Sequence, residues 1–146
     1  ELIGKCDIVV IEPGHHGDLL AAILGVPGRR VVTAISYFGL TGPYAHFVGC
    51  DLVAQSLGGI AWLTGEPGKP PLRIAGDQAY FVTSLYGAAA TSLAFLDSEL
   101  RNITHMIDVS AQECIAHSLV ATRRSVGGPQ GTSYGVADDG GSRRGR

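Results

Sequence analysis

Two short runs of β-branched apolar residues, separated by a helical segment, constrain the fold of this chain more than any other feature. The runs are CDIVVIEPG at 6–14 and RRVVTAISYFG at 29–39, and each is typical of a buried strand. Between them, DLLAAILG at 18–25 repeats apolar residues at helical spacing, and Gly25 is placed to end the helix. A strand, a helix and a strand in this order form parallel strands with the helix packed on the sheet. The sequence therefore predicts an α/β fold built from βαβ units.

A third strand and a capped helix are predicted towards the C-terminus. The stretch MIDVS contains a strand at 106–109, and Ser110 with Glu113 has the spacing of a capping box that opens a helix. The inward-facing residues of that helix are expected to be Ile115, Leu119 and Val120. The sequence therefore predicts a further strand that is followed directly by a helix.

Two more helices are expected between the second and third strands. DLVAQSLGGIAWLTG at 51–65 should bury an apolar stripe, and the long stretch 78–96 carries no charge at all. The stretch 78–96 contains glutamine, serine and threonine, which makes it too polar for a membrane span. Its small residues around Gly87 predict instead a long buried helix packed closely on several sides. The stripe in 51–65 consists of Leu52, Val53, Leu57 and Ile60.

Composition points to a domain that buries part of its surface against something else. The chain has 146 residues, 45% of them hydrophobic and only 16% charged, against roughly 25% charged in an average soluble domain. A net charge of −2 gives no general reason to bind nucleic acid or an acidic membrane. We expect residues 1–126 to form the domain and the glycine-rich residues 127–146 to form a flexible tail. The chain begins inside structured sequence, so it reads as a part of a longer protein.

The cysteines and histidines predict neither disulfides nor a metal site. Cys6, Cys50 and Cys114 are odd in number and widely spaced, as expected for reduced thiols of a cytoplasmic protein. His15 and His16 are adjacent in sequence and do not converge on a metal. Cys114 and His117 share a helical face, where a thiol with its base is one interpretation and packing is the favoured one.

Asp77 is the acid that most needs an explanation. It stands in LRIAGDQAYF at 72–81, and the next acidic residue is Asp97. An aspartate at the start of a helix caps its free N–H groups and complements the helix dipole. From residue types alone, capping is favoured over catalysis for Asp77.

Three segments favour a catalytic role for Asp77, because they resemble a known family. The segments are AISYFGLTGPYA, GCDLVAQSLGGIAWLTGEPGKPPLRIAGDQAYF and IDVSAQECIAHSL. In this order and spacing they resemble the central part of the class III CoA-transferases, the crotonobetainyl-CoA:carnitine and formyl-CoA transferase type. The resemblance runs from about residue 2 to about residue 124, and the related acyl-CoA racemases share the fold. It implies a fragment of a Rossmann-like parallel-sheet domain from a protein whose two identical subunits interlock.

The resemblance also implies a chemistry for two aspartates. It makes Asp77 the nucleophile that attacks an acyl-CoA and passes through acyl-aspartyl and aspartyl-CoA intermediates. CoA would then be a substrate, not a covalently bound cofactor, and a carboxylic acid would be the acceptor. Asp51 falls where the family carries an acid near the active site, which implies a role in orienting substrate. A cap for the helix that follows Asp51 is an equal alternative.

The resemblance leaves three functions open. The chain is a piece of an active CoA-transferase, or a non-catalytic remnant that serves as a binding or dimerisation module, or an acyl-CoA racemase or isomerase. The third would use Cys50 and Asp77 as its acid/base pair, although racemases carry a histidine where this chain has Cys50. Most contacts of the family with CoA are expected outside the segment that this chain covers.

Overall fold

A three-stranded parallel sheet forms the centre of the computed structural model, which describes residues 2–14, 17–65 and 69–119. The strands are β1 (Ile8–Ile11), β2 (Val31–Ser36) and β3 (His105–Ser110), in the order β1-β2-β3. Both pairs are parallel, with Val31 of β2 opposite Ile8 on one side and His105 on the other. The predicted α/β fold with a parallel sheet is therefore confirmed, and the third strand extends one residue beyond 106–109 at each end.

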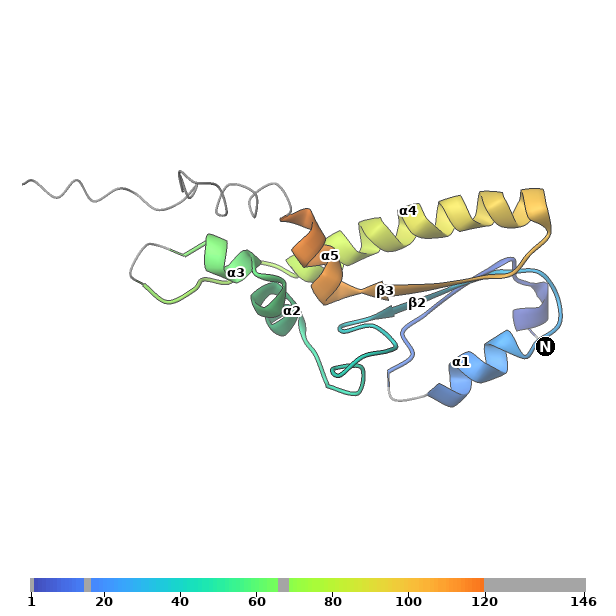
Figure 1. The fold of residues 1–146 in the computed structure, drawn as a ribbon, viewed down its shortest axis with the longest axis horizontal. Helices are drawn as coiled ribbons and strands as arrows, with labels where there is room; N and C mark the ends of the chain where they lie inside the picture. Colours follow the sequence, from blue (N-terminus) through green and yellow to red (C-terminus); the bar gives the residue numbers. More distant parts are fainter. Residues whose placement is uncertain (1, 15–16, 66–68, 120–146) are drawn as a thin grey trace, which may run out of the picture.

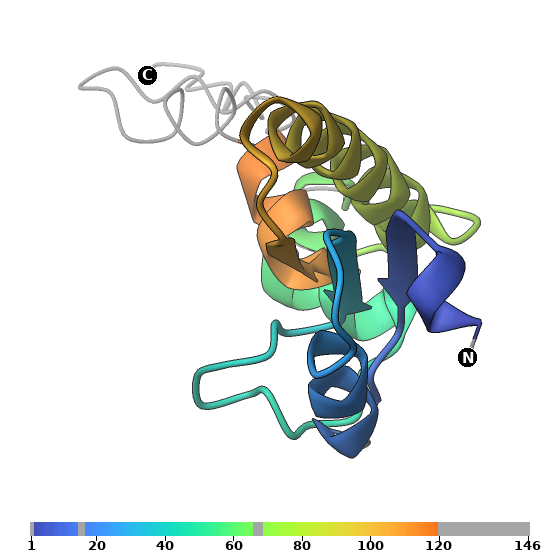
Figure 2. The ribbon, with the colours of Figure 1, turned by 90° about the vertical axis from the view of Figure 1, so that its right-hand side faces the viewer.

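Helices cover both faces of this sheet. In order along the chain they are a short 3-10 helix at Ile3–Lys5, α1 (Gly17–Leu24), α2 (Asp51–Gly58), α3 (Ile60–Leu63), α4 (Gln78–Arg101) and α5 (Ala111–Ser118). Figures 1 and 2 show α4 along one face of the sheet and α1 on the opposite face. The central strand is accordingly buried on both sides, since Val31, Val32, Thr33 and Ala34 are all fully buried.

Small and hydroxyl-bearing residues bring α4 close to β2. The hydroxyls of Thr33 and Thr91 lie 2.6 Å apart in a buried hydrogen bond. A Cβ on Gly87 would sit 3.4 Å from the Cδ1 atom of Ile35, in van der Waals contact, so the helix lies close to the strand at this residue. The sheet-facing side of α4 is therefore held by a directional bond as well as by packing.

The opposite side of α4 is apolar and exposed. Phe81, Leu85, Leu93, Leu96 and Leu100 are all exposed. The helix was predicted to be packed on several sides, but it is packed on one side only. Its large apolar residues lie on the side that faces away from the sheet. By length and composition α4 could also cross a membrane, so the expected absence of a membrane partner stays a prediction.

The apolar stripe predicted in 51–65 was wrong in part, because Val53 is half-buried and Ile60 packs against the core, but the other two residues do not. Leu52 and Leu57 are exposed, and the buried residues of α2 are instead Asp51, Ala54, Gln55 and Gly58. A Cβ on Gly58 would lie 2.4 Å from Cγ2 of Ile115, so the glycine lets α2 meet α5 at close range. The small side of α2 therefore faces the core, where Ala54 packs with Ala79, Ala111 and Ile115.

Candidate active site

Asp77 occupies the N-cap position of α4, but its carboxylate accepts no capping hydrogen bond. The side chain is 67% exposed, and its Oδ1 atom lies 3.7 Å from Nη2 of Arg73. Arg73 also donates to the carbonyl oxygen of Gly76, which has a positive φ of 80° at the turn into the helix. The position predicted for Asp77 is correct, whereas the predicted capping bond is not formed.

Asp51 caps α4 in place of Asp77. Its Oδ1 atom accepts hydrogen bonds from the backbone N–H of Ala79 at 2.8 Å and of Tyr80 at 3.2 Å. Its Oδ2 atom accepts from Nε2 of Gln55 at 2.5 Å. The side chain is buried at the first residue of α2. The interpretation of Asp51 as a cap for its own helix is therefore wrong, since it satisfies a helix that begins 27 residues later.

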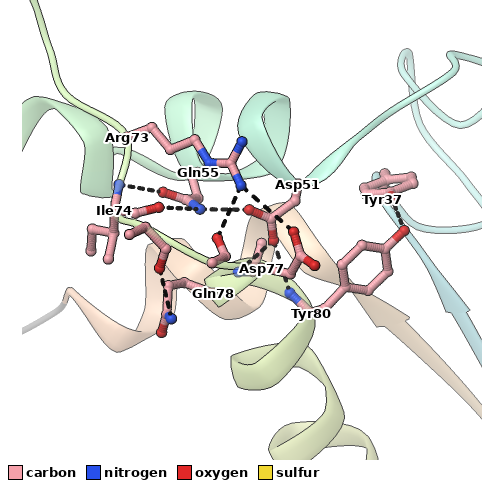
Figure 3. A network of polar contacts seen from close by, with 11 residues as sticks. Tyr37, Asp51, Gln55, Arg73, Ile74, Asp77, Gln78 and Tyr80 are labelled. Atoms are coloured by element: carbon pink, nitrogen blue, oxygen red, sulfur yellow. Dashed lines mark hydrogen bonds and ion pairs between the residues drawn. The ribbon is translucent and has the colours of Figure 1, made fainter.

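Gln55 completes the network around Asp51, as Figure 3 shows. Its Oε1 atom accepts from the backbone N–H of Ile74 at 3.0 Å, and the side chain is fully buried. This contact ties the segment that leads to Asp77 to α2. The sequence carried a signal for it, because Asp51 and Gln55 stand four residues apart and so share one face of a helix.

A pair of tyrosines joins the end of β2 to the first turn of α4. The hydroxyls of Tyr37 and Tyr80 form a hydrogen bond, and the two rings meet edge to face with centroids 5.7 Å apart. Burial and the bond to Tyr80 raise the pKa of Tyr37, with smaller contributions from Glu12 and Cys50. A Cβ at residue 49 would lie 2.3 Å from Cγ of Tyr37, so Gly49 is required for this ring position.

Two clefts open on either side of Tyr37, at the carboxyl ends of the strands. Each has a volume of about 240 Å³, and Glu12, Ser36 and Tyr37 line both. The first, here the α4 cleft, is also lined by Tyr80, Thr83 and Ser84 of α4. The second is also lined by Phe38, Phe47 and Gly49. Ligands of open α/β sheets bind at this edge of the sheet. Glu12 directly follows β1 and Tyr37 directly follows β2, and the end of each apolar run was the sequence signal that could have found them.

The thiol–base pair considered for Cys114 and His117 is not formed. Cys114 is buried, and burial, followed by the charge of Glu113, raises its pKa. His117 instead shares a hydrogen bond of 2.5 Å between Nδ1 and the hydroxyl of Tyr86. Packing is thus the better interpretation of Cys114.

The remaining predicted sites divide between exposed and undescribed residues. Cys50 is exposed at the N-cap of α2. His15, His16, Val120 and the tail at 127–146 lie outside the described residues. Within the described ranges, no group of three or more histidine, cysteine, aspartate or glutamate side chains could hold a metal ion.

Comparison with known proteins adds a family to this geometry. The model of CoA-transferase family III matches residues 25–138. The succinyl-CoA:(R)-benzylsuccinate CoA-transferase subunit BbsE of Thauera aromatica is 34% identical over 91 residues, which is 62% of this chain and 22% of that protein. The beta subunit of succinyl-CoA–L-malate CoA-transferase from Chloroflexus aurantiacus is 32% identical over 122 residues, which is 79% of this chain and 30% of that subunit. This chain thus spans less than a third of the length of either relative.

Solved structures show the same fold. A CaiB/BaiF family protein from Brucella suis superimposes with a TM-score of 0.79 at 27% identity, covering 86% of this chain and 34% of that one. A hypothetical protein from Mycobacterium tuberculosis shares the fold with a TM-score of 0.75 at 17% identity, over 88% of this chain and 38% of that one.

Proposed function

The chain belongs to CoA-transferase family III, and from this premise we propose that it carries the nucleophile of an enzyme that transfers coenzyme A between carboxylic acids. Relatives with this activity support the transfer itself. The assignment of the nucleophile to Asp77 is our own and rests on the site. Acyl-CoA and a free carboxylic acid are the proposed substrates.

One observation carries the proposal, namely that Asp77 stands at the start of a 24-residue helix with a carboxylate free of capping bonds. Asp51 meets the need of the helix for an acceptor, so Asp77 can form and break bonds without uncapping α4. The positive end of the helix dipole and Arg73 favour the carboxylate and the oxyanion that develops during attack. Bound substrate would also remove water from Asp77 and make it a better nucleophile.

The proposed reaction proceeds in four steps. A carboxylate oxygen of Asp77 attacks the thioester carbonyl, the C–S bond breaks, and an acyl-aspartyl anhydride and CoA thiolate result. The thiolate attacks the aspartyl carbonyl and releases the first carboxylate, which leaves an aspartyl-CoA thioester. The second acid attacks this thioester, so a new anhydride forms and the thiolate leaves again. The thiolate finally attacks the new acyl carbonyl, which gives the product acyl-CoA and restores Asp77.

For Asp51 the contacts favour a positioning role over contact with substrate. Both of its carboxylate oxygens are engaged with α4 and Gln55, and the side chain is 7% exposed. We propose that it fixes the start of α4 and thereby the direction of the Asp77 carboxylate.

Trapping the intermediate tests the nucleophile directly. Hydroxylamine converts an acyl-activated carboxyl into a stable hydroxamate, so we expect a hydroxamate at Asp77 when the protein is incubated with an acyl-CoA and hydroxylamine. Trypsin cleaves after Arg73 and Arg101 and so separates the peptide with Asp77 from the peptide with Asp51. Mass spectrometry of the two peptides, from the chain and from the complete reading frame around it, locates the modification. A hydroxamate at Asp51, or none at Asp77 in either protein, would remove Asp77 from the reaction.

The exposed side of α4 supports a further proposal about assembly. Contiguous exposed apolar surface is uncommon on proteins that stay monomeric, and the five large side chains of α4 follow one side of a long helix. We therefore expect this chain to self-associate through α4. Light scattering over a concentration series measures this, and Leu85→Gln with Leu93→Gln should shift the chain towards monomer. Leu19→Gln on α1 is the matched control, and a monomeric wild type at high concentration would refute the proposal.

A further inference from the structure

The α4 cleft contains polar groups that the four proposed steps leave unused. Asp77 is the N-cap residue of α4 and Tyr80 lies in its first turn, and Figure 3 shows the two side chains at the same end of the helix, between Arg73 and Tyr37. Tyr80 lines the cleft and reaches across it to Tyr37 at the end of β2. An acyl group attached to Asp77 would therefore extend along Tyr80 into this cleft, with the tyrosine hydroxyls one side-chain length from the helix.

The hydrogen-bonding capacity of the tyrosine pair is not exhausted. Each phenol has one O–H donor, and the bond between Tyr37 and Tyr80 uses only one of the two. A phenol carries its proton at neutral pH, and burial raises the pKa of Tyr37 further. The pair thus offers one O–H to whatever occupies the cleft.

Glu12 supplies the complementary acceptor. Glu12 lines the same cleft, and its negative charge contributes to the raised pKa of Tyr37. The walls between these groups are apolar and come from Val10, Ile11 and Ile35. No lysine or arginine is found among the described residues that line the cleft, so no cation there would form an ion pair with a second carboxylate.

We propose that the α4 cleft binds the acyl chain of a monocarboxylic acid that carries an uncharged hydroxyl group at its far end. The hydroxyl oxygen accepts from the tyrosine pair, and its O–H donates to Glu12. A far carboxylate is disfavoured because Glu12 repels it and cannot accept a hydrogen bond from it. This inference rests on the proposed function, since Asp77 sets the end of the chain that reacts.

A matched set of three six-carbon thioesters tests the cleft. Hexanoyl-CoA, 6-hydroxyhexanoyl-CoA and adipyl-CoA differ only at the far end of the chain. Their affinities are measured by calorimetry with the Asp77→Asn form of the complete reading frame, which does not consume them. We expect 6-hydroxyhexanoyl-CoA to bind about tenfold more tightly than hexanoyl-CoA, and adipyl-CoA to bind about tenfold more weakly.

Substitutions then assign the effect to named groups. The double substitution of Tyr37→Phe and Tyr80→Phe should remove the preference for the hydroxyl, because it removes both O–H donors. Either single substitution leaves one O–H free and should keep part of the preference. Glu12→Gln should restore the affinity for adipyl-CoA. Tyr86→Phe removes a hydroxyl from the same helix outside the cleft and should change nothing.

Every other result overturns the inference. Equal affinities for the three thioesters, tighter binding of adipyl-CoA, a preference that survives the double substitution, or no binding of any of them would each do so. The hydroxamate experiment on the wild type reports separately on Asp77. A hydroxamate without a hydroxyl preference would refute this inference alone, whereas a preference without a hydroxamate would refute only the role of Asp77.

Discussion

Asp77→Asn is expected to lower the rate of CoA transfer at least about a thousandfold, because an amide cannot form the acyl anhydride. The same substitution should change the free energy of unfolding by less than about 0.5 kcal/mol. The reason is that the carboxylate makes no capping bond and its 3.7 Å ion pair with Arg73 is exposed. The measurements are turnover of acyl-CoA, followed by chromatography, and unfolding in denaturant.

Asp77→Ala tests whether the carboxylate of Asp77 also stabilises α4 as a cap. If the carboxylate capped α4, alanine would cost about 1 kcal/mol and asparagine almost nothing. With Asp51 as the acceptor, both variants should unfold at the same denaturant concentration as the wild type. Asp97→Asn on the same helix is the control for activity and should retain it. An Asp77→Asn protein with more than about a tenth of the wild-type rate would be incompatible with a covalent role.

Asp51→Ala is expected to cost about 3 kcal/mol of stability. The substitution leaves the N–H groups of Ala79 and Tyr80 and the amide of Gln55 without their acceptor in a buried place. Asp51→Asn should cost about half as much, since its amide oxygen can still accept from α4 while its NH2 group meets the NH2 group of Gln55. Unfolding in denaturant measures both.

Asp7→Ala is the matched control for Asp51, because Asp7 is exposed. A loss at Asp51 no larger than at Asp7 would show that the capping network contributes nothing. CoA transfer should fall in Asp51→Asn together with hydroxamate formation at Asp77, because a displaced α4 moves the nucleophile. Normal transfer in a destabilised Asp51→Asn protein would rule out the positioning role.

Local patterns were sufficient for the sheet and for one helix start. The run at β2 is apolar without alternation because both of its faces are covered, and a short β-branched run of this kind is typical of a central strand. Ser110 accepts from the backbone N–H of Glu113 at 3.3 Å as its spacing predicts. For β2, the environment is apolar on both faces of the strand, so the order of the side chains does not matter. For the cap, Ser110 and Glu113 are only three residues apart in sequence.

The candidate site depended on contacts that local patterns do not contain. From sequence, the residue predicted to cap the free N–H groups of a helix is the nearest suitable one, which for α4 is Asp77. In the fold, Asp51 accepts the hydrogen bonds of these N–H groups instead. The prediction that Leu52 and Leu57 face the core was wrong for a similar reason, because the buried side of α2 is determined by contacts with distant segments. Gly58 became a contact residue because Ile115, from a distant part of the chain, fits against it.

The threonine bond between α4 and β2 has a consequence for how this segment can change in length. Thr33 holds α4 at Thr91, and about 21 Å of helix separates Thr91 from Asp77. One residue inserted between them would advance the start of the helix by about 1.5 Å and turn it by about 100°, which would carry Asp77 and Tyr80 away from Asp51 and Tyr37. Insertions in the loop before Leu72 impose no such rotation and leave the bond between Gln55 and Ile74 in place. The chain is therefore free to vary in length before Leu72, whereas the number of residues between Asp77 and Thr91 must stay the same.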